Sequence, residues 1–391
     1  MLPIMGGGQP EPGRFQYTAS TARTNSATVR RLQILMAVDL FWLVVSIGIL
    51  VSGAELLVRS SGRLAVRWGV PTFVIGVTVV GFGTSAPELA ASIASATSGH
   101  GQIAIGNVIG SNIMNIALVL GVTAMLAPIP VVRRIVRREV LATIVISFAP
   151  LLALLDDRWI DRPIAMLYII GLLAFLAWSF RSSRDGDPLP IESEIPDRPE
   201  DSGSARNLVF DLAIVVASIG LLVVGADTLV DAATGLARAF GVSELVIGLT
   251  IVAGGTSAPE LATSLVAVAR GKTDLGVGNV LGSCIFNLLG ILGVTALVVP
   301  LRIPPEVFLF DLPVMILTAL ACIPIMLSGH RIGRVEGAAL FVGFVVYTTL
   351  LFVGWPFPAD RSTSTAETVG WVDSQRTAAS IQPPPSTRSP S

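Results

Sequence analysis

Apolar segments separated by short polar ones run through most of the chain, and most reach the length of about 20 residues that a helix needs to cross a bilayer. The pattern predicts ten membrane-spanning helices, over residues 34–56, 70–97, 103–126, 138–155, 162–180, 208–230, 242–269, 275–299, 308–328 and 334–354. The second and seventh spans are long, and a short motif containing glycine, proline and glutamate interrupts each of them.

Three segments fall outside this pattern. Residues 1–31 are rich in Gly, Pro, Ser and Thr without apolar periodicity, and are predicted to be a disordered N-terminal segment. Residues 181–206 carry Arg, Asp, Glu and Pro and are expected to form a polar cytoplasmic linker. Residues 356–391 are rich in Pro, Ser and Thr and are predicted to be a disordered tail. The remaining chain forms two blocks of five spans, residues 32–180 and 207–355.

The two blocks are copies of one another. The hexapeptide Gly83–Glu88 recurs letter for letter as Gly255–Glu260, 172 residues later. About half the positions between Gly69 and Ala124 are identical to their partners at this offset, which shared hydrophobicity alone does not produce. Without a gap, the offset also aligns Gly106-Asn107 with Gly278-Asn279, Gly53-Ala54-Glu55 with Gly225-Ala226-Asp227, and Glu139 with Asp311.

The odd number of spans in each copy determines how the copies are related. After five crossings the chain is on the opposite side of the membrane, so the second copy starts in the reverse direction. Repeats related by a pseudo-two-fold axis in the membrane plane are typical of secondary transporters. The sequence therefore predicts an all-α polytopic membrane protein with ten transmembrane helices, built as two inverted five-helix repeats with discontinuous helices 2 and 7.

Composition and charge agree with this architecture. Only 14% of the residues are charged and 52% are hydrophobic, whereas soluble domains carry about 25% charged residues. The net charge of −1 gives no long-range attraction for nucleic acid. With the N-terminus outside, the predicted inside segments hold 15 of the 26 basic residues, and the outside loops hold Arg158, Arg162, Arg238 and Arg302. The positive-inside rule favours this orientation in the plasma or inner membrane.

The repeated hexapeptides place acids inside the membrane. A carboxylate at the middle of a spanning helix costs about 2.5–3.5 kcal/mol. Thr84 and Ser85 precede Glu88 by four and three residues and share its helix face. The adjacent proline leaves a backbone carbonyl without its helical hydrogen bond, and the glycines let the backbone approach a ligand. Because the second copy repeats this arrangement with Thr256, Ser257 and Glu260, an ion pathway is favoured over two incidental proline kinks.

A second set of polar residues follows in the next span of each copy: Ser111 and Asn115, and Ser283 and Asn287. In each copy the serine and the asparagine are four residues apart and share a helix face. They could be ligands or could make hydrogen bonds between helices, and the pattern favours neither. Helix packing is the favoured role for the small-xxx-small pairs in the same spans, Gly106/Gly110 and Gly278/Gly282.

Every candidate ligand atom is an oxygen. The two histidines, His100 and His330, fall in predicted loops, and Cys284 and Cys322 have no metal-ligand spacing. This disfavours zinc, copper and iron, and suits Ca²⁺ or Na⁺. Two glutamates balance one Ca²⁺ or two Na⁺, so a site that either occupant can neutralise provides a physical basis for exchange.

Other functions are weighed against this one. Exchange of Ca²⁺ for H⁺, with the glutamates carrying protons on the return, is an alternative. An ion channel is less favoured because two inverted halves with broken helices argue against a continuous pore. No enzyme is expected, since neither a nucleophile–base pair nor metal-binding histidines are present. No cofactor is expected either, and the partners are the transported cations and the lipid bilayer.

At these motifs the chain resembles the calcium/cation antiporter superfamily, in particular prokaryotic-type sodium/calcium exchangers. The resemblance covers nearly all of residues 34–354. It implies alternating access, with the first and sixth spans as a sliding pair of gating helices. Carried over by position, it implies Ca²⁺ ligands at Glu88, Glu260, Thr84 and Thr256. It implies Na⁺ ligands at Ser85, Ser257, Ser111 and Ser283 and at the carbonyls of Gly81 and Ala253.

One position departs from part of that family. Asn287, whose symmetric partner is Asn115, stands where some members, including potassium-dependent ones, carry an aspartate. The centre therefore has two acids instead of three, and potassium dependence is not expected. Glu55 and Asp227 end the first and sixth spans and are expected to be interfacial residues near the gate. The main hypothesis is an antiporter that exports Ca²⁺ in exchange for Na⁺.

Overall fold

The structure is a computed structural model that describes residues 17–130, 136–184, 205–241, 253–327 and 331–353. Residues 1–344 belong to one compact unit, and a second begins at Val345 within the last helix.

Within the described residues the chain is almost entirely helical. The first repeat contains α1 (Tyr17–Trp68), α2 (Thr72–Ile75), η1 (Gly76–Val80), α3 (Gly81–Thr84), α4 (Ala86–Thr97), α5 (Gly101–Ile113), η2 (Met114–Leu120), α6 (Gly121–Leu126), η3 (Val136–Val140), α8 (Leu141–Ser147), η4 (Ala149–Asp156) and α9 (Arg162–Arg184).

The second repeat has the same order of elements. It contains α10 (Ala205–Ala239), α12 (Ala253–Thr256), α13 (Ala258–Ala269), α14 (Thr273–Ile285), η7 (Phe286–Ile291), α15 (Leu292–Val298), η8 (Val307–Asp311), α16 (Leu312–Leu327) and α17 (Arg334–Val353). Among the described residues, eight helices are long and apolar enough to cross a membrane, and the bent pair Thr72–Thr84 and Ala86–Thr97 makes a ninth. The predicted seventh span, 242–269, lies partly outside the described residues, and α12 and α13 are its second part.

Both predicted helix breaks fall inside the hexapeptides. The backbone leaves the helical conformation at Ser85 (φ −85°, ψ 8°) and at Ser257 (φ −91°, ψ 7°). In each copy a proline occupies one of the first two positions of the helix that follows, where its missing N–H costs no helical hydrogen bond. The first break bends its span by 42°. Sequence and structure therefore agree on discontinuous helices at both places.

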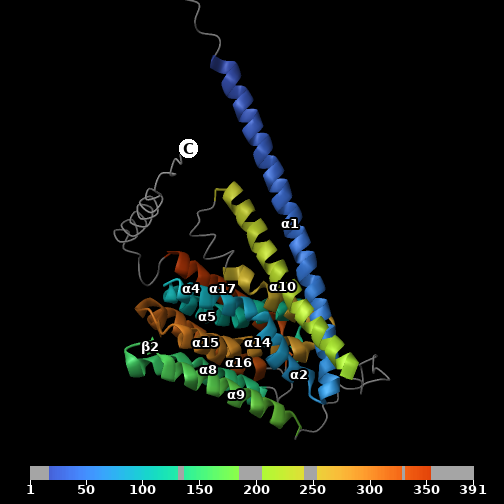
Figure 1. Ribbon diagram of the computed structural model, residues 1–391, viewed down its shortest axis with the longest axis vertical. Helices are drawn as coiled ribbons and strands as arrows, with labels where there is room; N and C mark the ends of the chain where they lie inside the picture. The colour runs from blue at the N-terminus through green and yellow to red at the C-terminus, as the bar shows by residue number, and fades with distance from the viewer. Residues whose placement is uncertain (1–16, 131–135, 185–204, 242–252, 328–330, 354–391) are drawn as a thin grey trace, which may run out of the picture. The chain divides into compact units, whose positions relative to one another are not determined.

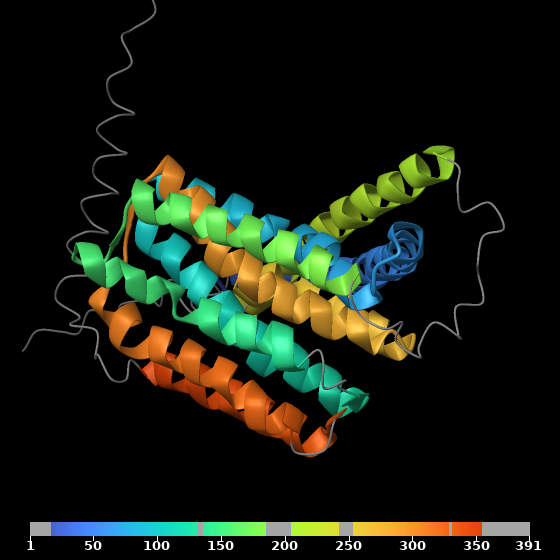
Figure 2. The ribbon, with the colours of Figure 1, turned by 90° about the horizontal axis from the view of Figure 1, so that it is seen from below.

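Two helices are longer than the apolar pattern predicts. α1 extends from Tyr17 to Trp68 instead of 34–56, and α10 from Ala205 to Ala239 instead of 208–230. The start of α1 falls within the segment predicted to be disordered, because the glycines and prolines of that segment all stand before residue 14. The two helices run side by side and obliquely to the other helices (Figures 1 and 2). Both helices therefore continue through polar residues beyond the ends of their apolar stretches.

Short strands join loops from the two repeats. β1 (Ile129–Pro130) pairs antiparallel with β4 (Arg331–Ile332), and β2 (Trp159–Ile160) with β3 (Leu301–Arg302). The 172-residue offset converts β1 into β3 and β2 into β4, so the two pairs are symmetry-related. They lie at opposite ends of α16, which separates β3 from β4. This arrangement is the one that inverted repeats require.

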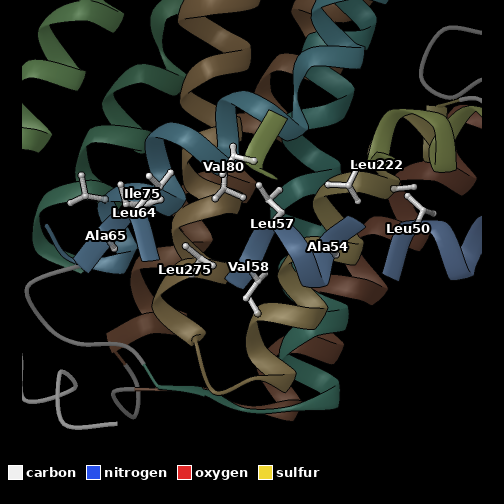
Figure 3. Close-up of a cluster of buried hydrophobic side chains, with 14 of the residues drawn as sticks. Leu50, Ala54, Leu57, Val58, Leu64, Ala65, Ile75, Val80, Leu222 and Leu275 are labelled. Carbon is white, nitrogen blue, oxygen red and sulfur yellow. The ribbon is translucent and has the colours of Figure 1, made fainter. Parts of the chain in front are cut away.

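A buried apolar cluster fixes α1 against the discontinuous helices (Figure 3). Leu57 and Val58 of α1 are fully buried, together with Ile75 of α2 and Leu275 of α14. Leu222 joins the cluster from α10. Because these side chains come from both repeats, burying them holds the two halves of the protein together around the hexapeptides.

Candidate cation-binding site

The two hexapeptide glutamates are the most deeply buried acids in the described part of the chain. Glu88 is 1% exposed and Glu260 is 0% exposed. Each stands in the first turn of the helix after the break, α4 or α13, where unpaired backbone N–H groups favour a negative charge. The two carboxylates are close enough to repel one another. The breaks thus bring acids from both repeats into one site.

Hydrogen bonds across the pseudo-two-fold axis join the hexapeptides. The Ser85 hydroxyl donates to Glu260 Oε1 at 3.0 Å, and the Ser257 hydroxyl donates to Glu88 Oε1 at 3.4 Å. Each serine therefore reaches the acid of the other repeat, not the acid three residues further along its own chain. The serines and glutamates of the two hexapeptides thus lie together, with the pairs formed between the repeats, and their roles as ion ligands stay predictions.

Several buried polar atoms at the site have no hydrogen-bond partner among the described residues. They include Glu88 Oε2, Glu260 Oε2, Asn115 Oδ1 and both amide atoms of Asn287. Leaving a buried polar group without a partner costs about 1–3 kcal/mol, and more when it is charged. A cation bound by the oxygens would remove this cost for the carboxylate and amide oxygens, although not for the Asn287 amide nitrogen. The arrangement therefore fits a ligand-dependent site better than a purely structural one.

Hydroxyl, amide and carbonyl groups surround the carboxylates. The Thr84 hydroxyl donates to Asn279 Oδ1 at 3.1 Å and lies 3.4 Å from the Ser283 hydroxyl. The Ser283 hydroxyl donates to the carbonyl of Gly81 at 3.3 Å. Thr84 and Ser283 also lie within reach of the Glu260 carboxylate. Contacts thus join Thr84, Gly81 and Ser283 to one another, and their roles as ligands stay predictions.

Two asparagines position the helices that carry the acids, and sequence reasoning gave them no role. Asn107 Nδ2 donates to the Glu88 carbonyl at 3.2 Å and to the Ser92 hydroxyl at 2.9 Å. Asn279 Nδ2 makes the matching bonds, to the Glu260 carbonyl at 3.3 Å and to Ser264 at 3.0 Å. Their conservation between the two copies, in the repeated Gly-Asn pair, was the available signal.

The other pair of asparagines lies on widened helical turns. Asn115 belongs to the π-helix η2 and Asn287 to its counterpart η7. Both side chains are buried, and π-turns inside α-helices are frequent at functional sites because they turn a side chain away from the regular face. The sequence did not indicate these π-turns.

The remaining predicted residues are less closely tied to the acids. Ser111 is buried, Thr256 is half-buried, and Ala253 begins α12. Their roles as ligands stay predictions. Glu55 lies elsewhere, half-exposed in ion pairs with arginines. Gly282 packs against the backbone of Val77, as the small-xxx-small pattern predicted, whereas no described atom lies within 4 Å of a Cβ added at Gly106 or Gly110.

The donor set consists of oxygens. Within the described ranges, no three or more His, Cys, Asp or Glu side chains are grouped to hold a metal ion. Cys284 and Cys322 are buried and free. Two carboxylates with hydroxyl and carbonyl oxygens, set at helix breaks between inverted repeats, are the arrangement of a secondary cation transporter.

Comparison with known proteins identifies the family. The family model described as sodium/calcium exchanger protein matches residues 38–181 and 210–353, one match in each repeat. The chain belongs to this family, and it is a multi-pass membrane transport protein. The inner membrane protein YrbG of Escherichia coli is 34% identical over 319 residues, which cover 79% of this chain and 95% of YrbG.

Two further comparisons also match sodium/calcium exchangers. The sodium/calcium exchanger MaX1 of Methanosarcina acetivorans is 31% identical over 353 residues, which cover 81% of this chain and 99% of MaX1. The solved structure of the sodium-calcium exchanger NCX_Mj, soaked with 10 mM Na⁺ and zero Ca²⁺, matches with a TM-score of 0.68 and 28% identity. That match covers 81% of this chain and 99% of the solved chain.

Proposed function

We propose that the protein exchanges Ca²⁺ for Na⁺ by alternating access, with both ions as transported substrates and no resident cofactor. The observation that carries the proposal is the pair of buried glutamates whose second carboxylate oxygens have no partner among the described residues. A dication or two monocations would neutralise this pair, whereas two buried, unneutralised charges oppose reorientation. The names of the relatives MaX1 and NCX_Mj support the choice of ions.

The proposed ligands follow from position. Glu88, Glu260, Thr84 and Thr256 would hold Ca²⁺. Na⁺ would be held by Ser85, Ser257, Ser111 and Ser283 with the carbonyls of Gly81 and Ala253. Asn115 and Asn287 would add amide oxygens. Hard oxygen ligands of this kind suit both ions, and the two acids limit the positive charge that the site can neutralise.

We also propose an orientation, with the N-terminus outside and the 181–206 linker in the cytoplasm. The charge distribution supports it, because basic residues concentrate in the predicted inside segments. The strand pairs support the relative arrangement of the loops. β1 pairs with β4 at the end predicted to be inside, and β2 with β3 at the end predicted to be outside.

Flux into proteoliposomes tests the proposal. We expect Na⁺-loaded vesicles to take up ⁴⁵Ca²⁺ along an outward Na⁺ gradient, and Glu88→Gln to reduce uptake at least tenfold. Glu139→Gln is the matched control, since Glu139 is a buried intramembrane acid outside the site. Absence of gradient-dependent uptake, or full activity in Glu88→Gln, would contradict the proposal. Uptake driven by a pH gradient without Na⁺ would show exchange with H⁺ instead.

A further inference from the structure

Ionic contacts tie α1 to the connection between α13 and α14. Glu55 of α1 accepts hydrogen bonds from Arg270, which follows α13, with Nη2–Oε1 at 2.6 Å and Nε–Oε2 at 2.9 Å. Arg59, one turn further along α1, pairs with the same carboxylate. The Lys272 ammonium donates to the Val58 carbonyl at 3.4 Å. These contacts lie beside the apolar cluster that buries Leu57 and Val58.

Glu55 lies between cations on both elements. Arg59 and Arg63 are on α1, and Arg270 and Lys272 are on the connection. Burial of Lys272, followed by the nearby Arg63 cation, lowers the pKa of its ammonium group. Without the Glu55 carboxylate, α1 and the connection would face each other with like charges. Glu55 therefore turns a repulsive contact into an attractive one.

The other repeat cannot form these contacts. At the 172-residue offset Glu55 corresponds to Asp227, but Arg270 corresponds to Ser98 and Arg59 to Asp231. Packing shows the same difference, since α1 lies along α13, whereas contact between its counterpart α10 and α4 is at most slight. The symmetry of the repeats is thus broken at the place where a gating helix meets a broken helix.

We propose that Glu55, Arg270 and Lys272 form an ionic latch that holds α1 against α13 and keeps the acid pair closed from this end. α13 carries Glu260 in its first turn, so α1 lying along α13 covers the approach from the α13–α14 connection. Because the other end lacks the latch, the conformational equilibrium favours the state that is closed here. The latch proposal depends on the proposed exchange only in experiments that measure transport.

Chemical labelling tests the latch without transport. Val58→Cys introduces a thiol at a position that is fully buried beside the latch, in a chain whose own cysteines are buried. We expect Glu55→Gln and Arg270→Gln to speed labelling by N-ethylmaleimide about twofold to fivefold, as for partly exposed ion pairs. Glu55→Gln should have the larger effect, because it also leaves Arg59, Arg270 and Lys272 close together without the acid between them, whereas Arg63 keeps its partner Asp211. Arg270→Lys keeps the charge but loses the two-point contact, so it should label at a rate between those of the parent and Arg270→Gln.

Asp227→Asn is the matched control, since it removes the symmetry-related acid that has no latch partner in sequence. We expect it to leave labelling unchanged. A double-mutant cycle provides the second measurement: Glu55→Gln with Arg270→Gln should be clearly non-additive. Equal labelling in the parent, Glu55→Gln and Arg270→Gln would overturn the latch, as would an equal increase in Asp227→Asn. A protein that labels as expected but carries no Ca²⁺ would instead contradict the proposed exchange.

Discussion

At the residue scale, the acids and hydroxyls of the site could be predicted from sequence because both hexapeptides are identical. The partners of these residues could not. Ser85 bonds to Glu260 across the repeats, a contact that depends on how the halves pack. The repeated Gly-Asn pair marks Asn279, but its role could not be predicted, because no sequence pattern identifies the backbone and hydroxyl groups to which its amide bonds.

Replacement of Asn279 tests this positioning role. Asn279→Ala removes bonds to the Glu260 carbonyl, Ser264 and Thr84, each worth about 0.5–1.5 kcal/mol. We expect the apparent Ca²⁺ affinity to fall about tenfold or more, measured by calorimetry on the purified protein. Asn112→Ala is the control, because among the described residues the Asn112 amide donates to the Val108 carbonyl in its own helix, and the counterpart of Asn112 in the second repeat is Cys284. Equal losses in both variants would contradict the role.

At the element scale, spans and breaks followed from hydropathy and from the hexapeptides, but helix ends and π-turns did not. α1 continues beyond its apolar stretch because Arg63 and Arg67, which follow that stretch, form ion pairs with the buried Asp211 of α10, at 2.6 and 2.8 Å. Contacts between helices therefore keep polar residues helical beyond the point at which the hydropathy pattern predicts the helix to end. One contact between helices, by contrast, could be predicted from sequence: the small-xxx-small spacing indicated the close approach at Gly282.

That contact makes a stability prediction. An added Cβ at Gly282 would overlap the backbone of Val77, with the Val77 Cα at 2.5 Å, and backbone cannot rotate away as a side chain can. We expect Gly282→Ala to cost about 1–3 kcal/mol of folding free energy and lower the melting temperature by several degrees. Gly220→Ala should be neutral or stabilising, because no described atom lies within 4 Å of its added Cβ and alanine favours helix. A Gly282→Ala protein that melts like the parent would contradict this packing.

At the scale of the whole molecule, the repeat and its odd span count were sufficient to predict an inverted architecture. They could not predict which of two exchanged conformations the chain adopts, because exact pseudo-symmetry makes both equivalent. The side chains that break the symmetry decide this. Arg270 opposite Ser98, and Arg59 opposite Asp231, favour contact of α1 with α13 over contact of α10 with α4.

The orientation of the whole molecule can be measured at the strand pairs. Arg302 of β3 and Arg331 of β4 are exposed and lie at opposite ends of α16. We expect Arg302→Cys to react in intact cells with a membrane-impermeant maleimide. Arg331→Cys should react only after permeabilisation, because the positive-inside rule places the more basic loops in the cytoplasm. The native cysteines provide a low background, being buried. The reverse labelling would keep the inverted repeats but turn the protein over, placing the end that holds the latch outside.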